Sequence, residues 1–430
     1  MAQQHGRPLA VLTSLFFMWG LITSLNDILI PHLKALFSLS YVEAMLVQFC
    51  FFMAYFVVSL PAGWLLQRLG YQRGLVVGLG TIGVGCLLFY PAAGAHAYPL
   101  FLGALFVLAA GVTLLQVAAN PYVTLLGEPE TASSRLNLTQ AFNSLGATVG
   151  PMVGAVAILG AADHAVGAQA DPSSVQGPYL VLAGLLFLLA VVVAWVRLPD
   201  PRRLVEAQQA ELRGSAASAD AGEQGSLWAH RHLVLGAVAI FAYVGAEVSI
   251  GSLLVNLMGE PAIAGLSAAE AGKWLSLYWG AAMVGRFIGS ALMRKVSAAR
   301  VLAAAGLVNA ALIALAIAVS GPVAMWSLLA VGLFNSIMFP TIFALALEGL
   351  GALTSRGSGL LCMAIVGGAI VPLAQALLAD HWGLLPSFAV PLVCYLYIAH
   401  YGGWGHQPAG PAVTEPAEPL RAPRAAAQGA

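Results

Sequence analysis

Two carboxylates set in long apolar stretches are the side chains of this 430-residue chain best suited to do chemistry. Asp27 follows the apolar run Leu9–Leu25, and Glu247 lies in a run that begins at Leu233. In a membrane span a charged side chain is costly and normally faces a cavity or a partner. A desolvated carboxylate can take up a proton, and an ionised one can hold a metal cation. Asp27 and Glu247 are therefore predicted to bind a cation; the alternative for Asp27 is a solvated position at the outer end of a tilted helix.

Side-chain amides also recur inside the apolar stretches. Gln140 and Asn143 lie about one helical turn apart and so share a helix face. An amide both donates and accepts hydrogen bonds, as the hydroxyl groups of a sugar do. Hydrogen bonding between helices is the other role that such residues commonly have in membranes. The predicted substrate-binding residues are the amides of these stretches: Asn26, Gln116, Asn120, Gln140, Asn143 and Asn256.

The overall composition is that of a membrane protein. Hydrophobic residues make up 60% of the chain and charged residues 8%, against about 25% charged in a soluble domain. Uncharged blocks such as Leu75–Ala95 and Leu100–Ala119 reach the roughly 20 residues that span a bilayer. The formal net charge of zero gives no electrostatic case for nucleic-acid binding. Lipid is therefore the expected surrounding of this chain.

Polar and Pro/Gly-rich breaks divide the apolar sequence into twelve blocks. They predict an all-α membrane protein with twelve transmembrane helices in two six-helix bundles. The predicted spans are 9–36, 43–67, 74–95, 98–126, 136–160, 178–197, 232–258, 268–293, 299–320, 323–349, 357–379 and 384–404. The predicted units are an N-terminal bundle (1–198), a cytoplasmic linker (199–230), a C-terminal bundle (231–404) and a disordered cytoplasmic tail (405–430).

The basic residues test this layout independently. With the N-terminus inside, all but three of the 18 Lys and Arg residues fall on one side of the membrane. The exceptions are Lys34 and Lys273 on the other side and Arg286 within the eighth span. Because Lys- and Arg-rich loops stay cytoplasmic, both termini are predicted to be cytoplasmic.

Motifs for other chemistries carry little weight in this sequence. Gly78, Gly80 and Gly83 spell G-x-G-x-x-G, but inside an apolar span, so they are predicted to be helix-packing glycines. The four cysteines are widely spaced in apolar runs and are expected to be small buried side chains, not disulfides. The chain is therefore not expected to be an enzyme or to hold a resident metal or cofactor. A monomer is the expected state.

A faint internal repeat relates the two predicted bundles. Pro121 and Arg135 in the first half match Pro340 and Arg356 in the second in order and approximate spacing. Two halves of the same orientation are the parallel-repeat plan of major facilitator transporters, in which the substrate binds at the interface of the halves.

Longer motifs carry a resemblance to a known family. The stretch Gly63–Arg73 resembles the major facilitator loop signature between the second and third spans, with Gln67 where Asp is usual. The chain resembles the fucose:proton symporter family over nearly all of residues 10–400. The runs that carry this resemblance are Leu25–Leu33, Gln116–Pro121, Arg135–Gly146 and Tyr243–Glu247. The resemblance implies import of a monosaccharide across the bacterial inner membrane. It implies that Asp27 is a coupling or sugar-binding carboxylate and that Gln140 and Asn143 are sugar ligands.

One departure separates this chain from the fucose carriers of that family. They have Glu at the position of Gln116 and an amide at the position of Glu247, so one carboxylate has moved from the fourth span to the seventh. This arrangement resembles the glucose/galactose branch, and it leaves both proton and sodium open as the co-transported ion. The expected function is therefore hexose:cation symport by alternating access, with fucose as a further possible sugar.

Other functions fit these residues less well. An exporter of drugs or metabolites, the nearest alternative, would more often have an apolar and aromatic site than an amide-rich one. An enzyme acting on lipid-linked sugar would need a catalytic cluster near one interface, and the acidic residues near span ends offer none: Glu128, Glu130, Glu348 and Asp380. A sugar sensor would usually carry a signalling domain, whereas the 405–430 tail is rich in Pro and Ala.

Overall fold

The computed structural model describes residues 8–22, 41–95, 97–154, 176–196 and 226–408. Two predicted site residues, Asn26 and Asp27, lie outside these ranges. Most of the predicted linker and of the predicted tail also lies outside them. The described residues form helices joined by short turns, without a strand among them.

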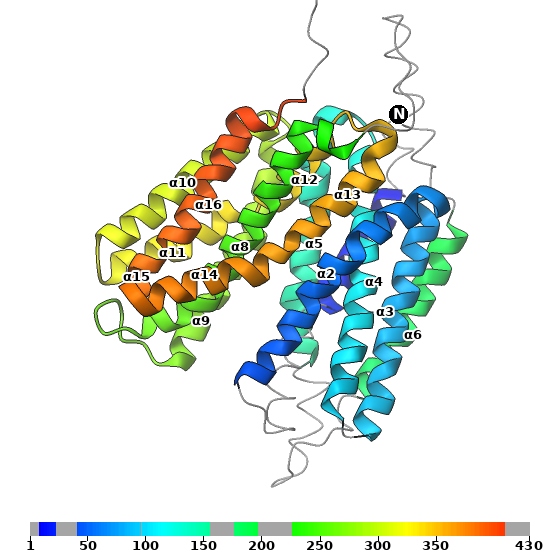
Figure 1. Ribbon diagram of the computed structural model, residues 1–430, viewed down its shortest axis with the longest axis horizontal. Helices are drawn as coiled ribbons and strands as arrows, with labels where there is room; N and C mark the ends of the chain where they lie inside the picture. Colours follow the sequence, from blue (N-terminus) through cyan, green and yellow to red (C-terminus); the bar gives the residue numbers. More distant parts are fainter. Residues whose placement is uncertain (1–7, 23–40, 96, 155–175, 197–225, 409–430) are drawn as a thin grey trace, which may run out of the picture.

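Six spans make up the N-terminal half (Figure 1). The first begins with a helix over Pro8–Ile22. It is followed by α2 (Tyr41–Leu69), α3 (Tyr71–Gly94), α4 (Tyr98–Leu125), α5 (Ala132–Gly154) and α6 (Gln176–Trp195). A single turn, η1 (Pro129–Thr131), joins α4 to α5.

The C-terminal half also has six spans, and its last three are divided. A turn, η4 (Leu227–Ala229), leads into this half. The continuous helices are α8 (Arg231–Gly259), α9 (Ala268–Leu292) and α10 (Ala298–Ala318). The tenth span consists of α11 (Pro322–Asn335) and α12 (Met338–Leu347). The eleventh runs from η5 (Gly351–Leu353) through α13 (Thr354–Met363) and η6 (Ala364–Val366) to α14 (Gly367–Trp382). The twelfth comprises α15 (Leu384–Ser387), α16 (Ala389–His400) and η7 (Tyr401–Gly405).

This architecture confirms the predicted fold class of twelve transmembrane helices in two bundles. Among the described residues, nine helical stretches are long and apolar enough to cross a membrane by themselves. The Pro8–Ile22 helix is apolar but shorter. The remaining two, α5 and α9, carry more polar and charged side chains. These two helices pack against each other where the halves meet (Figure 1).

Proline explains the division of the tenth span. Pro340 has no N–H group, and its ring would clash with the carbonyl of the residue four positions earlier, which is Ser336. Ser336 lies at the break between α11 and α12. Its carbonyl instead accepts a hydrogen bond from Arg286 Nε at 3.0 Å.

The first half contains the corresponding feature in α4. Pro121 leaves the carbonyl of Val117 without its helical donor. Ser358 Oγ of α13 donates to that carbonyl at 2.8 Å. A backbone group freed by proline in one half is therefore satisfied by a side chain of the other half.

Glycines permit close helix crossings in the N-terminal half. A Cβ atom on Gly78 would lie 3.0 Å from the backbone nitrogen of Leu115 in α4. A Cβ atom on Gly83 would lie 2.9 Å from the ring of Phe187 in α6. Gly78 and Gly83 thus have the predicted packing role. Gly80, by contrast, has no described atom near its Cβ position and faces open space.

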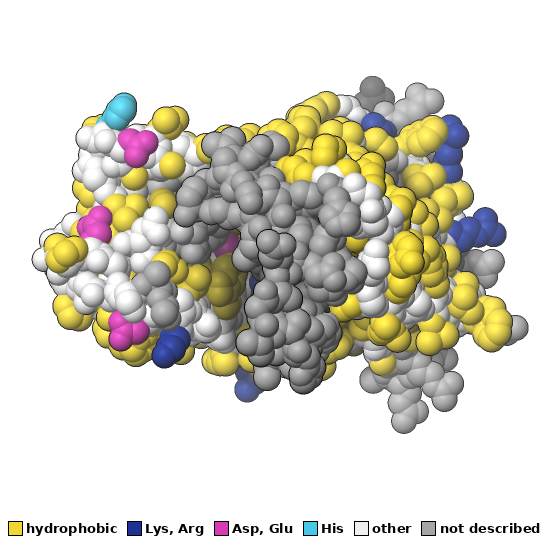
Figure 2. Space-filling view, turned by 90° about the horizontal axis from the view of Figure 1, so that it is seen from below, with side chains coloured by type: hydrophobic (Ala, Val, Ile, Leu, Met, Phe, Trp, Pro, Cys, Tyr) yellow, Lys and Arg dark blue, Asp and Glu magenta, His cyan; other side chains and the backbone are white. Residues whose placement is uncertain are grey.

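Large hydrophobic side chains cover the outside of the molecule. Figure 2 shows them densely over the right-hand part of the described surface and in separate patches over the left-hand part. On α6, Val181, Leu188 and Trp195 have exposed fractions of 65%, 61% and 84%. So much exposed apolar surface suits lipid chains and not water.

Candidate functional site

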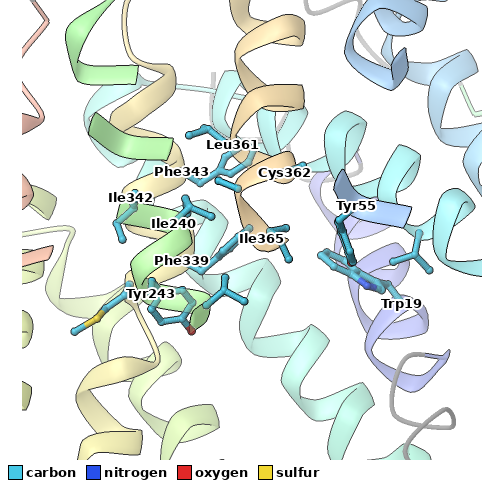
Figure 3. Packing of buried hydrophobic residues seen from close by; sticks show 14 of the residues in the cluster. Trp19, Tyr55, Ile240, Tyr243, Phe339, Ile342, Phe343, Leu361, Cys362 and Ile365 are labelled. Carbon is cyan, nitrogen blue, oxygen red and sulfur yellow. The ribbon is translucent and has the colours of Figure 1, made fainter. Parts of the chain in front are cut away.

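Glu247 lies half-buried on α8 and is hydrogen-bonded by its own helix. Tyr243, one turn earlier, donates from its hydroxyl to Glu247 Oε1 at 2.7 Å. Figure 3 shows Tyr243 at the edge of an apolar cluster with Ile240 and Phe339, and its hydroxyl oxygen points away from that cluster. The spacing of four residues places the two side chains on one helix face, where they can meet.

A second donor reaches Glu247 from the tenth span. Asn335, the last residue of α11, directs Nδ2 toward Glu247 Oε1 at 3.4 Å and toward the Tyr278 hydroxyl at 3.3 Å. Its Oδ1 accepts a hydrogen bond from the Tyr395 hydroxyl at 2.8 Å. Four helices, α8, α9, α11 and α16, therefore hold the carboxylate in place. We call Glu247, Tyr243, Asn335, Tyr278 and Tyr395 the carboxylate cluster.

Only Glu247 of this cluster was predicted as a site residue from sequence. Tyr243 and Asn335 are visible in the sequence as polar residues inside apolar spans. Tyr278 and Tyr395 give no such signal, since buried tyrosines are common in helical cores and their partners lie 57 and 60 residues away. Arg286 is the other residue that was missed, although an arginine within a span is the same kind of signal that singles out Glu247.

The predicted amides of the N-terminal half meet one another. Gln116 and Asn120 are buried on α4, with exposed fractions of 4% and 0%. Gln140 of α5 is also buried, and its Nε2 donates to Asn120 Oδ1 at 3.4 Å. Gln116 Oε1 and Asn120 Nδ2 have no hydrogen-bond partner among the described residues. A buried amide atom without a partner costs about 1–3 kcal/mol, so both atoms favour a polar ligand here.

Asn143 has the interhelical role that was its alternative prediction. Its Nδ2 donates to the carbonyl of Phe16, in the Pro8–Ile22 helix, at 2.9 Å. The two helices touch at Gly20 and Gly146, where a Cβ atom would collide with the backbone of the other helix. Asn143 remains half-buried, so this contact leaves part of its side chain accessible.

Asn256 is not brought to the carboxylate cluster. It lies nine residues beyond Glu247 on α8, which is about 13 Å along the helix axis at 1.5 Å per residue. Its side chain is exposed. Asp27 and Asn26 lie outside the described residues, so the predicted pairing of Asp27 with Glu247 stays a prediction.

The two halves contact each other near one end of the molecule. We call it the basic end, because Arg68, Arg294 and Arg356 lie there. Asn137 Nδ2 of α5 donates to Thr341 Oγ1 of α12 at 3.1 Å. Ser355 Oγ of α13 donates to the Tyr71 hydroxyl of α3 at 3.0 Å.

Small residues close this end further. A Cβ atom on Gly63 of α2 would lie 2.8 Å from the carbonyl oxygen of Ser355. One on Gly359 of α13 would lie 2.7 Å from the carbonyl oxygen of Ser59. Without side chains at these two positions, α2 and α13 approach to backbone contact.

Metal-ligand chemistry has little support in the described part of the chain. Within it, no three His, Cys, Asp or Glu side chains group closely enough to hold a metal ion. All four cysteines are described and are free thiols; Cys86 and Cys362 are buried as predicted, whereas Cys50 and Cys394 are only partly buried.

The sequence matches a family model over residues 11–372, and the description of that model is Major Facilitator Superfamily. The chain belongs to the major facilitator superfamily. Its relatives in this superfamily include a glucose/galactose transporter of Brucella abortus (biovar 1, strain 9-941), which is 58% identical over 401 residues. That match covers 93% of this chain and 94% of the Brucella protein. Residues 11–372 extend from the first span into the eleventh and so include residues of both halves.

Fucose carriers of the superfamily are more distant relatives. The L-fucose-proton symporter of Escherichia coli (strain K12) is 34% identical over 406 residues, which is 91% of each chain. The crystal structure of the major facilitator transporter FucP in the outward conformation superimposes with a TM-score of 0.83 and 32% identity, covering 94% of this chain and 99% of FucP. These matches confirm the resemblance to the fucose:proton symporter family and its glucose/galactose branch.

Proposed function

We propose that this protein is a secondary active transporter that imports a hexose of the glucose or galactose type together with a cation. The observation that carries the proposal is the 58% identity, over nearly the whole of both chains, to the Brucella glucose/galactose transporter. The proposed cell location is the bacterial inner membrane, with both termini in the cytoplasm.

Glu247 is the described carboxylate that we assign to the cation. Tyr243 and Asn335 both direct donors at its Oε1, an arrangement that stabilises an ionised carboxylate. A proton or a sodium ion that neutralises this charge would change the hydrogen bonding of α8, α11 and α16 at once. Asp27 is the second carboxylate of the proposed coupling site.

The sugar is assigned to the buried amides on α4 and α5. Gln116 Oε1 offers an acceptor and Asn120 Nδ2 offers a donor, and neither has a partner among the described residues. Hydroxyl groups of a hexose can satisfy both. Gln140, Asn143, Asn26 and Asn256 complete the proposed set of sugar ligands.

Alternating access is supported by the position of the contacts between the halves. They lie toward the basic end, which is predicted from the charge pattern to be cytoplasmic. Closure there corresponds to a conformation that opens to the outside, and the superposition on FucP in its outward conformation agrees with this assignment. Rocking of the two halves about the site would then expose it to the cytoplasm.

Uptake into proteoliposomes tests the proposal. Purified protein would be reconstituted, and labelled D-glucose and D-galactose would be supplied under an imposed inward sodium gradient or an inward proton gradient. We expect one gradient to drive accumulation of sugar above the outside concentration, and an ionophore that collapses the gradient to abolish it. L-fucose serves as the competing sugar. The proposal is wrong if neither gradient drives accumulation of glucose, galactose or fucose.

A further inference from the structure

Arg286 is a charged residue within the spans whose role neither proposed site explains. It lies half-buried on α9. A charge at this depth is costly unless it is paired or hydrogen-bonded. Its Nε donates to the Ser336 carbonyl, the group that Pro340 frees in the divided tenth span. The arginine thus holds the break between α11 and α12.

The same side chain crosses to the N-terminal half. Nη1 of Arg286 donates to the carbonyl of Gln140 at 3.4 Å and to Ser144 Oγ. Both acceptors lie on one face of α5, one turn apart. Gln140 is a proposed sugar ligand, and its side chain meets Asn120. One guanidinium therefore contacts the backbone at the proposed sugar site.

The break that Arg286 holds also adjoins the proposed cation site. Asn335 donates to Glu247 and directly precedes Ser336, whose carbonyl Arg286 holds. Arg286 and Glu247 also interact electrostatically. Salt screens an attraction between partly buried charges much less than one between exposed charges. A change in the charge of Glu247 therefore changes its electrostatic attraction to Arg286.

We propose that Arg286 is the positioning residue that couples cation binding at Glu247 to sugar affinity at α5. This inference rests on the proposed function. A cation at Glu247 removes the attraction between that carboxylate and the guanidinium. Arg286 is then held more firmly by Gln140 and Ser144, which fixes α5 and its amides in the geometry that binds sugar. By linkage, bound sugar raises the affinity for the cation by the same factor.

Binding of D-glucose to the purified full-length protein in detergent measures this coupling. The readout is the ratio of the dissociation constants without and with the cation, sodium or proton, that drives uptake. Coupling between sites is typically about 5- to 150-fold, so we expect a ratio of at least about fivefold for the parent protein. Arg286→Gln should reduce the ratio to about twofold or less.

Two further variants separate coupling from a general loss of structure. Arg286→Lys keeps the charge but not the planar fork of donors, and it should restore part of the ratio. Lys273→Gln removes an exposed charge from the same helix and should leave the ratio unchanged. If Arg286→Gln does not fold, Ser144→Ala removes one contact of the arginine and should lower the ratio as well.

The possible results distinguish the two proposals. If the parent protein couples sugar and cation and Arg286→Gln, or Ser144→Ala in its place, keeps the full ratio, the role of Arg286 is wrong and the proposed function stands. If the parent protein binds no sugar with either cation, the proposed function fails, and the role of Arg286 fails with it.

Discussion

Ser134 of α5 and Ser290 of α9 exchange hydrogen bonds, each hydroxyl donating to the backbone carbonyl of the other residue at 2.7 and 2.9 Å. Both residues are buried, and they belong to opposite halves. The pair lies in the first turn of α5 and the last turn of α9, at the basic end. In an alternating-access cycle this pair must separate once in each turnover.

A disulfide at this pair should therefore stop transport. The two hydroxyl oxygens are 3.3 Å apart, so the sulfur atoms of cysteines at these two positions would lie close to each other. We expect Ser134→Cys combined with Ser290→Cys to lose sugar uptake after oxidation and to regain it in reductant. Each single variant is the control and should transport in both conditions. Undiminished uptake by the fully cross-linked protein would show that the halves do not part here.

Tyr243→Phe tests the hydrogen bond to Glu247. Without the 2.7 Å donor, the ionised carboxylate is less stabilised, and neutralisation by a cation becomes more favourable. Hydrogen bonds to charged groups contribute about 1.5–3 kcal/mol, so the cation concentration for half-maximal uptake should fall about tenfold or more. Tyr179→Phe is the matched control, because that buried hydroxyl has no partner among the described residues. An unchanged cation dependence in Tyr243→Phe would separate this tyrosine from coupling.

Gln140→Ala tests the amide pair of the proposed sugar site. The substitution removes the side chain that donates to Asn120 but keeps the backbone carbonyl that Arg286 holds. We expect the KM for sugar to rise about tenfold, corresponding to the loss of one or two hydrogen bonds, with little change in thermal stability. Uptake kinetics and a melting curve give the two values. A lowered melting temperature with an unchanged KM would assign Gln140 to helix packing alone.

Asn309→Leu is expected to stabilise the protein. Asn309 is fully buried in α10, and neither its Nδ2 nor its Oδ1 has a partner among the described residues. Replacing an unsatisfied buried amide with an apolar side chain of similar size should gain about 1–3 kcal/mol. A raised melting temperature with normal uptake is the expected result. A lower melting temperature would mean that the amide has a partner, such as a water molecule, in the folded protein.

Composition and charge pattern were sufficient to predict the architecture. The apolar blocks have the length of a span, and nearly all basic residues fall in every second loop between them. Only a few arrangements of spans satisfy both conditions. Span bounds such as Tyr98–Leu125 for α4 lie within a few residues of those expected from sequence. Proline alone does not indicate which span is interrupted, because Pro121 lies inside the continuous helix α4 whereas Pro340 follows the break between α11 and α12.

Side-chain partners across helices could not be predicted in this way. The polar character of Asn143 is plain in the sequence, but whether its amide meets a sugar or the Phe16 carbonyl depends on how closely two glycines let the helices approach. Likewise, Arg286 could be recognised as unusual, but its contacts with α5 depend on the relative position of the two halves. Such contacts join residues more than a hundred positions apart, where periodicity carries no information.

Accumulation of sugar by Glu247→Gln tests the central claim most directly. The variant keeps an acceptor for Tyr243 but removes the charge to which the cation is assigned. Proteoliposomes with the parent protein should concentrate labelled D-glucose or D-galactose under the driving gradient. The variant should only equilibrate the sugar, while still exchanging labelled for unlabelled sugar. If Glu247→Gln accumulates sugar to the same level as the parent protein, the carboxylate does not couple the cation to transport and the account is contradicted.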